Sequence, residues 1–244
     1  MEAKNCLIIG AGSDLARALA HQLAEDNWHL QLIGRNADTL KTLVSEIKPL
    51  AASVEAVSLD MNQVERCLDW VQTNTVRPSV VIVVGALMPE PNQPICDQDL
   101  ETLLDTNVVS TLRLLNELAE FMKAGGQGGI IVGVSSLAGL RGRSSNYAYG
   151  ASKAALTTFL SGMRARYLRD GIHVMTVLPG FIATKMIRSE STPKLLTDDP
   201  DRFAKRIIQG IQRRSDYVDG GVLWRLIALV ISWLPEWLFK RLRF

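Results

Sequence analysis

The sequence predicts an α/β fold in which helices cover both faces of a parallel sheet. Short apolar runs alternate along the chain with amphipathic stretches, which is the order that such a sheet requires. The run at residues 80–84 is almost wholly β-branched, as in a strand buried on both faces. With 244 residues, of which 47% are hydrophobic and 21% charged, the chain has an ordinary globular composition and suffices for one large domain.

The first half of the chain holds three strand and helix pairs. The apolar run 6–9 is the first strand, and residues 15–24 have apolar side chains at helical spacing. The run 29–33 is the second strand, and the helix expected from about 37 to 47 ends before Pro49. A third strand at 54–59 precedes a helix at 64–71.

The second half continues the alternation from the strand at 80–84. A long helix is expected from about 100 to 122, and the glycine-rich turn 125–129 leads to a strand at 130–134. A helix that carries Tyr149 and a strand at 174–178 follow. Because the alternation resumes directly after the glycine turn, we expect a single domain over residues 1–221 and a tail over 222–244.

Charge, cysteines and histidines exclude several classes of function. The formal net charge of +2 gives no case for nucleic-acid binding. Cys6, Cys67 and Cys96 are scattered without metal-ligand spacing, which predicts reduced core thiols in a cytoplasmic protein. The three histidines are equally dispersed, so we expect neither a metal site nor a serine hydrolase. The N-terminus shows no signal-peptide pattern.

The most informative chemistry lies at Tyr149 and Lys153, four residues apart, because a helix places both side chains on one face. A free phenol has a pKa of about 10, and a lysine ammonium one turn away stabilises the phenolate, so the proton can leave or return near neutrality. A serine hydroxyl from a neighbouring strand end could hold a substrate carbonyl oxygen against the tyrosine. Ser135 and Ser136 would point to opposite faces of such a strand end.

A glycine turn lies between the first strand and the first helix, with the sequence Gly10-Ala11-Gly12-Ser13-Asp14-Leu15-Ala16. There, backbone amides and the helix N-terminus can meet a pyrophosphate. Any tight strand-to-helix turn also favours glycine, so the motif alone is weak. Asp14 is unwelcome near phosphates, although its carboxylate could instead cap the helix.

Three further polar residues stand at informative positions. Arg35 ends the second strand, where dinucleotide folds present a side chain to the adenosine ribose; an arginine suits a 2′-phosphate, which favours NADP over NAD. The alternative is a solvated loop arginine. Asp60 could bind the adenine amino group or cap the next helix. Asn107 interrupts a helix, which indicates a local kink with bound water or simply an exposed asparagine.

Over roughly residues 4–190 the chain resembles the short-chain dehydrogenase/reductase superfamily. The resemblance rests on the glycine loop, Asp60, Val84-Gly85-Ala86, Asn107, Ser136, Tyr149, Lys153 and Pro179-Gly180-Phe181-Ile182-Ala183-Thr184, in that order. It implies a Rossmann-type domain that binds a nicotinamide cofactor, with Tyr149 as the catalytic acid or base. Lys153 would lower the pKa of the tyrosine and hold the nicotinamide ribose. The family spacing selects Ser136 to orient the substrate oxygen, and Asn107 would anchor a water that links Lys153 to solvent.

The resemblance also implies a set of cofactor contacts and an assembly. Thr184 would contact the nicotinamide carboxamide or the phosphates, and Ile182 would offer its backbone. Relatives usually pair through the two long helices, which implies a homodimer or homotetramer. The expected cofactor-binding residues are Gly10, Gly12, Ser13, Asp14, Leu15, Arg35, Asp60, Met61, Gly85, Ala86, Tyr149, Lys153, Pro179, Gly180, Ile182 and Thr184.

The tail, residues 222–244, contains three of the five tryptophans and ends in the cations Lys240, Arg241 and Arg243. Its apolar run is too short for a spanning helix, which needs about 20 residues, and too apolar for a freely solvated one. Indoles and cations together suit the membrane interface. Alternatively, the tail packs over the substrate pocket or against a second subunit.

Together these features predict an NADP-dependent oxidoreductase that reduces a ketone or oxidises a secondary alcohol through Ser136, Tyr149 and Lys153. We expect a small or lipid-like substrate, bound largely by the loop at about 187–196 and by the helix that follows it. The alternative is a membrane-attached, cofactor-binding protein with a regulatory or scaffolding role. A nucleotide-sugar epimerase is disfavoured, because the chain after Pro179 is too short for an extra substrate domain. We expect a cytoplasmic location, peripheral at the inner face of a membrane if the tail attaches there.

Overall fold

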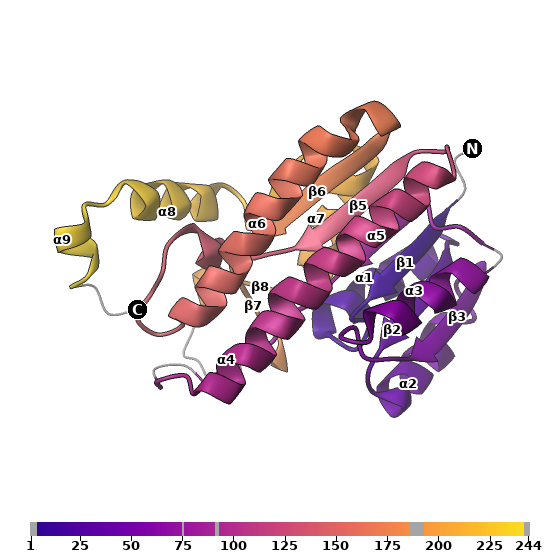
Figure 1. Cartoon of the computed structure of the whole chain (residues 1–244), viewed down its shortest axis with the longest axis horizontal. Coiled ribbons are helices and arrows are strands. Elements are labelled where there is room, and N and C mark those ends of the chain that lie inside the picture. The colour runs from indigo at the N-terminus through magenta and orange to yellow at the C-terminus, as the bar shows by residue number, and fades with distance from the viewer. Residues whose placement is uncertain (1–3, 75, 91–92, 186–192, 242–244) are drawn as a thin grey trace.

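A seven-stranded parallel sheet forms the centre of the molecule in this computed structural model, which describes residues 4–241 apart from 75, 91–92 and 186–192. The strand order is β3-β2-β1-β4-β5-β6-β9, and every neighbouring pair is parallel (Figure 1). The order runs outward from β1 in both directions, so the predicted doubly wound α/β sheet is confirmed. The strands are β1 (Asn5–Ile9), β2 (His29–Gly34), β3 (Ser53–Ser58), β4 (Val80–Val83), β5 (Gly129–Val134), β6 (Ile172–Leu178) and β9 (Tyr217–Asp219).

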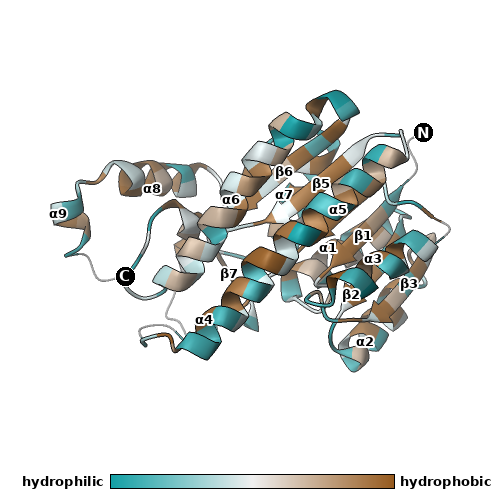
Figure 2. Ribbon diagram, in the orientation of Figure 1, coloured by the Kyte–Doolittle hydropathy of each residue, from teal (hydrophilic) through white to brown (hydrophobic). Residues whose placement is uncertain are grey.

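Helices cover both faces of the sheet, and each layer has its own apolar core. Alternate side chains of β1 illustrate this: Ile8 packs in one cluster, whereas Leu7 and Ile9 pack in the other. The strands appear brown between the two helical layers in Figure 2. The first layer contains α1 (Asp14–Glu25), α2 (Ala37–Ile47) and α7 (Pro200–Gln212), and the second contains α3 (Val64–Thr73), α5 (Thr111–Ala124) and α6 (Tyr147–Tyr167).

The long helix expected from about 100 to 122 begins earlier and is not regular. It starts as α4 (Asp97–Leu104), widens into a π-helical segment, η1 (Asp105–Ser110), and continues as α5. Such segments inside α-helices frequently occur at functional sites, and this one contains Asn107.

Several short elements were not expected, because two or three residues are too few to show a periodicity. These are β9 at the sheet edge and the small parallel sheet of β7 (Phe181–Ile182) with β8 (Thr197–Asp198). The remaining single turns are η2 (Leu137–Leu140), η3 (Leu168–Asp170) and η5 (Lys194–Leu196).

The cysteine prediction is correct for two of the three residues. Cys6 and Cys67 are buried, and burial raises the pKa of Cys67 to about 11. Cys96 is exposed, so its assignment to the core was wrong. It lies at the N-cap of α4, where a surface helix begins.

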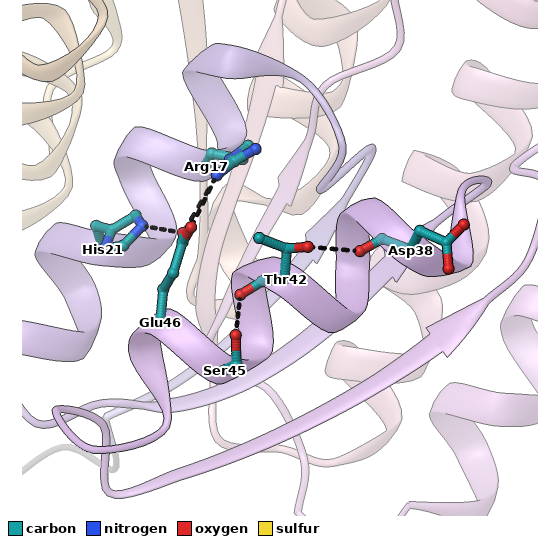
Figure 3. Close-up of polar contacts among 6 residues, drawn as sticks. All are labelled: Arg17, His21, Asp38, Thr42, Ser45 and Glu46. Carbon is teal, nitrogen blue, oxygen red and sulfur yellow. Dashed lines mark hydrogen bonds and ion pairs between the residues drawn. The ribbon is translucent and has the colours of Figure 1, made fainter.

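Polar contacts join the last turn of α2 to α1. The Glu46 carboxylate of α2 lies 2.9 Å from His21 Nε2 and 3.2 Å from the Arg17 guanidinium, both on α1 (Figure 3). The His21 hydrogen bond, with help from Arg17, holds the pKa of Glu46 below its usual range. These contacts fix the spacing between the two elements that follow the glycine turn and Arg35.

The tail forms two helices, α8 (Val222–Trp233) and α9 (Glu236–Phe239), which lie to the left of α6 in Figure 1. Within the part of the chain that the structure describes, no helix is both long enough and apolar enough to cross a membrane. The tail packs against η2, the turn that follows Ser136.

Candidate active site

Ser136, Tyr149 and Lys153 line one cavity of about 320 Å³ at the carboxyl end of the sheet. Ser136 lies two residues after the end of β5. Tyr149 and Lys153 lie one helical turn apart in α6. Their exposed fractions are 8%, 9% and 1%, so the phenol and the hydroxyl border the cavity while the lysine lies beneath it. The spacing predicted from the sequence therefore brings the three side chains together.

Lys153 is held by two backbone carbonyl groups. Its Nζ donates to Gly85 O at 2.7 Å and to Val134 O at 3.1 Å, and lies 5.7 Å from the centroid of the Tyr149 ring. An ammonium group has three donors, so one N–H has no acceptor among the described residues. Desolvation by burial lowers the pKa of Lys153 to about 7. The amine therefore changes charge near neutrality, next to the phenol.

The two adjacent serines have different partners, as the alternation of a strand end requires. Ser135 Oγ donates to Lys153 O at 2.8 Å and lies 2.7 Å from Thr157 Oγ1, so it fixes β5 to α6. Ser136 Oγ accepts from Ala138 N at 3.1 Å and makes a long contact of 3.5 Å to Pro179 O. Both serines line the cavity, but the Ser135 hydroxyl is held by α6, whereas the Ser136 hydroxyl contacts the turn that follows it and Pro179.

Asn107 is fully buried in η1, so the alternative of an exposed helix asparagine is wrong. Its Oδ1 accepts from Leu87 N at 2.7 Å, and its Nδ2 donates to Leu87 O at 2.8 Å and to Ser152 Oγ at 3.1 Å. Ser152 Oγ in turn donates to Tyr149 O at 2.8 Å. Asn107 does not line the cavity, but it fixes the chain after β4 to the helix of the tyrosine.

The glycine turn forms the opposite end of the cavity, where Gly12, Ser13, Asp14 and Leu15 line it. Gly10 does not line the cavity. It has φ +84° and lies so close to the chain after β4 that a Cβ there would meet Val84 O at 2.2 Å. No such obstacle stands at Gly12, whose Cβ would approach only a methyl group of Thr39, at 4.0 Å. The turn therefore offers open backbone and the unpaired first amides of α1.

Asp14 does not cap α1, which corrects one of the two interpretations of this residue. The N-cap is Ser13, whose side chain accepts from Ala16 N. The Asp14 carboxylate instead accepts from Lys185 N at 2.7 Å, across the cavity mouth. This contact joins the glycine turn to the segment after β7.

Arg35, Asp60 and Met61 lie outside the cavity lining. Arg35 is exposed beyond β2, and its guanidinium has no hydrogen bond or ion pair among the described residues. Asp60 Oδ1 accepts from Asn62 N at 2.9 Å, and the N-cap of α3 is Gln63, so Asp60 does not cap that helix. Met61 is buried near Gly85.

The segment after β6 closes the cavity from the other side. Ala86, just after β4, also lines it, and so do six residues of this segment, Pro179, Gly180, Phe181, Ile182, Thr184 and Lys185. Gly85 lies just behind, where a Cβ would meet Thr111 Oγ1 at 2.6 Å. Residues 187–192 of the expected substrate loop lie outside the described residues.

Helix α8 forms one wall of the cavity, which agrees with the alternative that the tail packs over the substrate pocket; sequence reasoning did not name the residues of that wall. Trp224, Ile227, Ala228 and Ile231 line the cavity, and their spacing of three, one and three residues places them on one helical face. Trp224 donates from Nε1 to Leu196 O at 3.1 Å. Its ring occupies the space where a Cβ at Gly180 would lie, at 2.1 Å. The spacing was a usable signal, but the apolar residues all round α8 concealed which face is inward.

The cavity lining offers suitable groups for the pyrophosphate and the nicotinamide ribose of a dinucleotide. It joins a helix N-terminus at Gly12–Leu15, which suits a pyrophosphate, to the spare N–H of Lys153, which suits a ribose hydroxyl. The hydroxyls of Ser136 and Tyr149 stand at the far end, where a small polar group of a substrate would meet them.

Comparisons with known proteins agree with this geometry. A family model described as short chain dehydrogenase matches residues 4–194. A sulfoacetaldehyde reductase of Chromohalobacter salexigens is 30% identical over 187 residues, which cover 74% of each chain. A human very-long-chain 3-oxoacyl-CoA reductase is 25% identical over 97% of this chain and 77% of its own. A short chain dehydrogenase from Burkholderia cenocepacia, solved in complex with NADP, superposes with a TM-score of 0.82 at 22% identity, covering 98% of this chain and 97% of its own.

Proposed function

The chain belongs to the short-chain dehydrogenase family, and from this premise we propose that it is an NADP(H)-dependent oxidoreductase that reduces a ketone or oxidises a secondary alcohol. The observation that carries the proposal is that Ser136, Tyr149 and Lys153 meet at one cavity with the glycine turn. A protein with only a scaffolding role needs the turn but not all three side chains.

The cofactor would lie along the cavity from the glycine turn to Tyr149. When bound, it supplies or accepts the hydride. Gly12, Ser13 and the first amides of α1 would hold its pyrophosphate, and Lys153 its nicotinamide ribose. Thr184 and the backbone of Ile182 would border the nicotinamide.

Arg35 supports NADP(H) rather than NAD(H). Its exposed guanidinium follows β2 directly, and neither Gly34 nor Asn36 supplies the carboxylate that would accept from a free 2′-hydroxyl. The Asn36 side chain is already used, because it accepts from Thr39 N at 2.8 Å. The NADP in the Burkholderia cenocepacia relative agrees with this assignment.

The chain's own groups would move the proton. In reduction, Tyr149 donates its phenolic proton to the carbonyl oxygen of the substrate, and in oxidation its phenolate takes the proton of the alcohol. When it is protonated, Lys153 favours the phenolate, because its Nζ lies 5.7 Å from the centroid of the Tyr149 ring. Ser136 donates a hydrogen bond to the same substrate oxygen and so fixes it against the tyrosine.

Asn107 is proposed as a positioning residue. Through Leu87 and Ser152 it fixes the chain after β4 relative to α6, and Gly85 of that chain accepts from Lys153. Its side chain touches neither the phenol nor the ammonium. We therefore expect Asn107 to act on the geometry of the lysine.

The substrate is proposed to be apolar beyond its reacting group. The cavity wall includes Leu137, Leu140 and the inner face of α8, together with the polar side chains of Arg141, Arg143 and Asn146. A substrate with an alkyl or ring portion would displace water from the apolar side chains. The human relative's name, a very-long-chain 3-oxoacyl-CoA reductase, agrees with an apolar substrate.

The same family resemblance supports a homodimer or homotetramer paired through α4, α5 and α6. Helices α5 and α6 lie side by side on one face of the sheet (Figure 1). Leu104 and Val109 are 38% and 48% exposed on the helix that runs through η1. Light scattering of the pure protein measures this assembly, and a monomer at micromolar concentration would overturn it.

The function is tested by incubating the pure protein with NADPH and ketones that share one carbonyl but carry alkyl chains of increasing length. We expect NADPH oxidation whose kcat/KM rises with chain length, and weaker turnover with NADH. Binding of NADPH with no reduction of any ketone, and with no reduction of NADP⁺ by any alcohol, would contradict the proposal.

A further inference from the structure

Helix α8 carries a second apolar face that the fold does not bury. Val222, Leu223, Leu226, Leu229, Val230 and Trp233 are 72%, 42%, 55%, 58%, 60% and 82% exposed. At about 100° per residue, this spacing gathers them in one stripe roughly 120° wide. Trp237 of α9 adds a further indole, 60% exposed. These seven residues are here called the outer stripe.

The outer stripe is separate from the cavity wall. The residues of α8 that line the cavity are Trp224, Ile227, Ala228 and Ile231, none of which belongs to the stripe. The apolar side chains on one face of α8 are therefore explained by their place in the cavity wall. Those of the outer stripe remain exposed to solvent. Scattered exposed apolar residues are ordinary, but a contiguous apolar stripe marks an interaction surface.

Arg141 holds the corner between α8 and α9 in place. Its guanidinium donates to Ile231 O at 2.7 Å and to Leu234 O, pairs with Glu236 at 2.6 Å, and stacks 4.0 Å from the centroid of the Phe239 ring. The outer stripe is thus presented by a helix that is fixed to the catalytic turn η2, beside the cavity.

The charges around the stripe are unbalanced in one direction. Arg225 is paired with Asp219 at 2.6 Å, and the one acidic residue of the two helices, Glu236, is paired with Arg141. Lys240 and Arg241 are exposed and, among the residues with assigned positions, have no ion pair. The stripe is therefore bordered by available cations and by no available carboxylate of its own.

We propose that the outer stripe docks on the headgroup layer of an anionic lipid bilayer, with the indoles of Trp233 and Trp237 in the interface and Lys240 and Arg241 on the lipid phosphates. Exposed tryptophans beside cations are the composition that such an interface favours. A second copy of the tail would bring more cations and no unpaired acid to receive them. The proposal goes beyond the proposed oxidoreductase and does not depend on turnover.

The test uses the full chain and co-sedimentation with vesicles of phosphatidylcholine alone or mixed with phosphatidylglycerol. We expect binding to the mixed vesicles that weakens as salt is added. The double variant Leu226→Ser/Leu229→Ser should bind at least about tenfold more weakly, because it removes apolar area from the stripe alone. The double variant Lys240→Gln/Arg241→Gln should also bind the mixed vesicles more weakly than the unmodified chain.

Leu168→Ser is the matched control, because Leu168 is 73% exposed but lies in η3, outside the tail. It should bind vesicles as the unmodified chain does. Equal binding by Leu226→Ser/Leu229→Ser, or no binding of the unmodified chain to anionic vesicles, would overturn the proposal. A loss of dimer by light scattering in that double variant, with vesicle binding unchanged, would assign the stripe to a second copy and overturn it too. Because NADPH oxidation is measured separately, failure here leaves the proposed catalysis standing.

Discussion

Asn107 and Leu87 exchange two hydrogen bonds, from Leu87 N to Asn107 Oδ1 at 2.7 Å and from Asn107 Nδ2 to Leu87 O at 2.8 Å. A side-chain amide thereby pairs with the main chain as a neighbouring strand would. It does so from η1, where the wider turn of the helix supplies the space. The chain that leaves β4 is in this way fixed to the helix layer.

Replacement of Asn107 tests that role. Asn107→Leu leaves both polar groups of Leu87 without this partner, so we expect the free energy of unfolding to fall by about 2–4 kcal/mol. Urea denaturation measures the change. Gln98→Leu, an exposed amide on α4, is the control and should stay within about 0.5 kcal/mol. An equally small effect at Asn107 would show that its hydrogen bonds do not hold the chain after β4.

The pH dependence of stability tests the burial of Lys153. Its pKa is about 7 in the folded protein and near 10.5 when exposed in the unfolded chain. Between these values the unfolded state binds one more proton, so this group makes stability rise with pH from about 7 to 10, by a total on the order of 5 kcal/mol. Below pH 7 both states hold the proton and the contribution is lost.

Lys153→Met keeps the side-chain volume and removes the titration. Thermal or urea unfolding at a series of pH values should give a smaller rise above pH 7 in this variant than in the unmodified chain. Lys123→Met, on a side chain that is 38% exposed, should leave the rise intact. Parallel pH curves for the unmodified chain and Lys153→Met would contradict the assigned pKa.

Arg35 should decide between the two nicotinamide cofactors. Arg35→Gln removes the cation proposed for the 2′-phosphate, so we expect the Kd for NADPH to rise by about 10- to 100-fold while that for NADH changes little. Fluorescence titration measures both. Lys41→Gln, an exposed cation on α2, serves as the control. Equal effects on the two cofactors would place the 2′-phosphate elsewhere.

Limited proteolysis tests whether Arg141 holds the corner between α8 and α9. Arg141→Gln removes the contacts to Ile231, Glu236 and the Phe239 ring. We expect chymotrypsin to cleave within 222–241 about tenfold faster, because local opening precedes cleavage. The global unfolding transition should not move. Arg113→Gln removes a surface ion pair with Glu65 and should change neither the cleavage rate nor the unfolding transition. Unchanged cleavage in Arg141→Gln would mean that other contacts hold α8.

The sequence was a good guide to the parts of the fold that repeat. Apolar runs located β1, β2, β4, β5 and β6 to within two residues, because buried parallel strands are continuous apolar runs. Helical spacing likewise paired Tyr149 with Lys153. The three-residue β9 had no periodicity to detect.

Long-range contacts decided what the sequence could not. The partner of Asn107 is 20 residues away, and nothing near Leu87 marks it. The tail shows the same limit: its apolar residues surround the helix, so only its packing against Gly180 and η2 separates the cavity wall from the outer stripe. The exposure of Cys96 also follows from its place at the start of α4, not from its residue type.

The most direct measurement of the central claim compares Tyr149→Phe with Tyr147→Phe. Both changes remove one phenolic hydroxyl from the start of α6, but Tyr147 is 50% exposed and has no lysine four residues on. We expect kcat/KM with NADPH and a ketone to fall by roughly 10²-fold or more in Tyr149→Phe, with NADPH binding retained, and to change little in Tyr147→Phe. Full turnover by Tyr149→Phe would contradict the account.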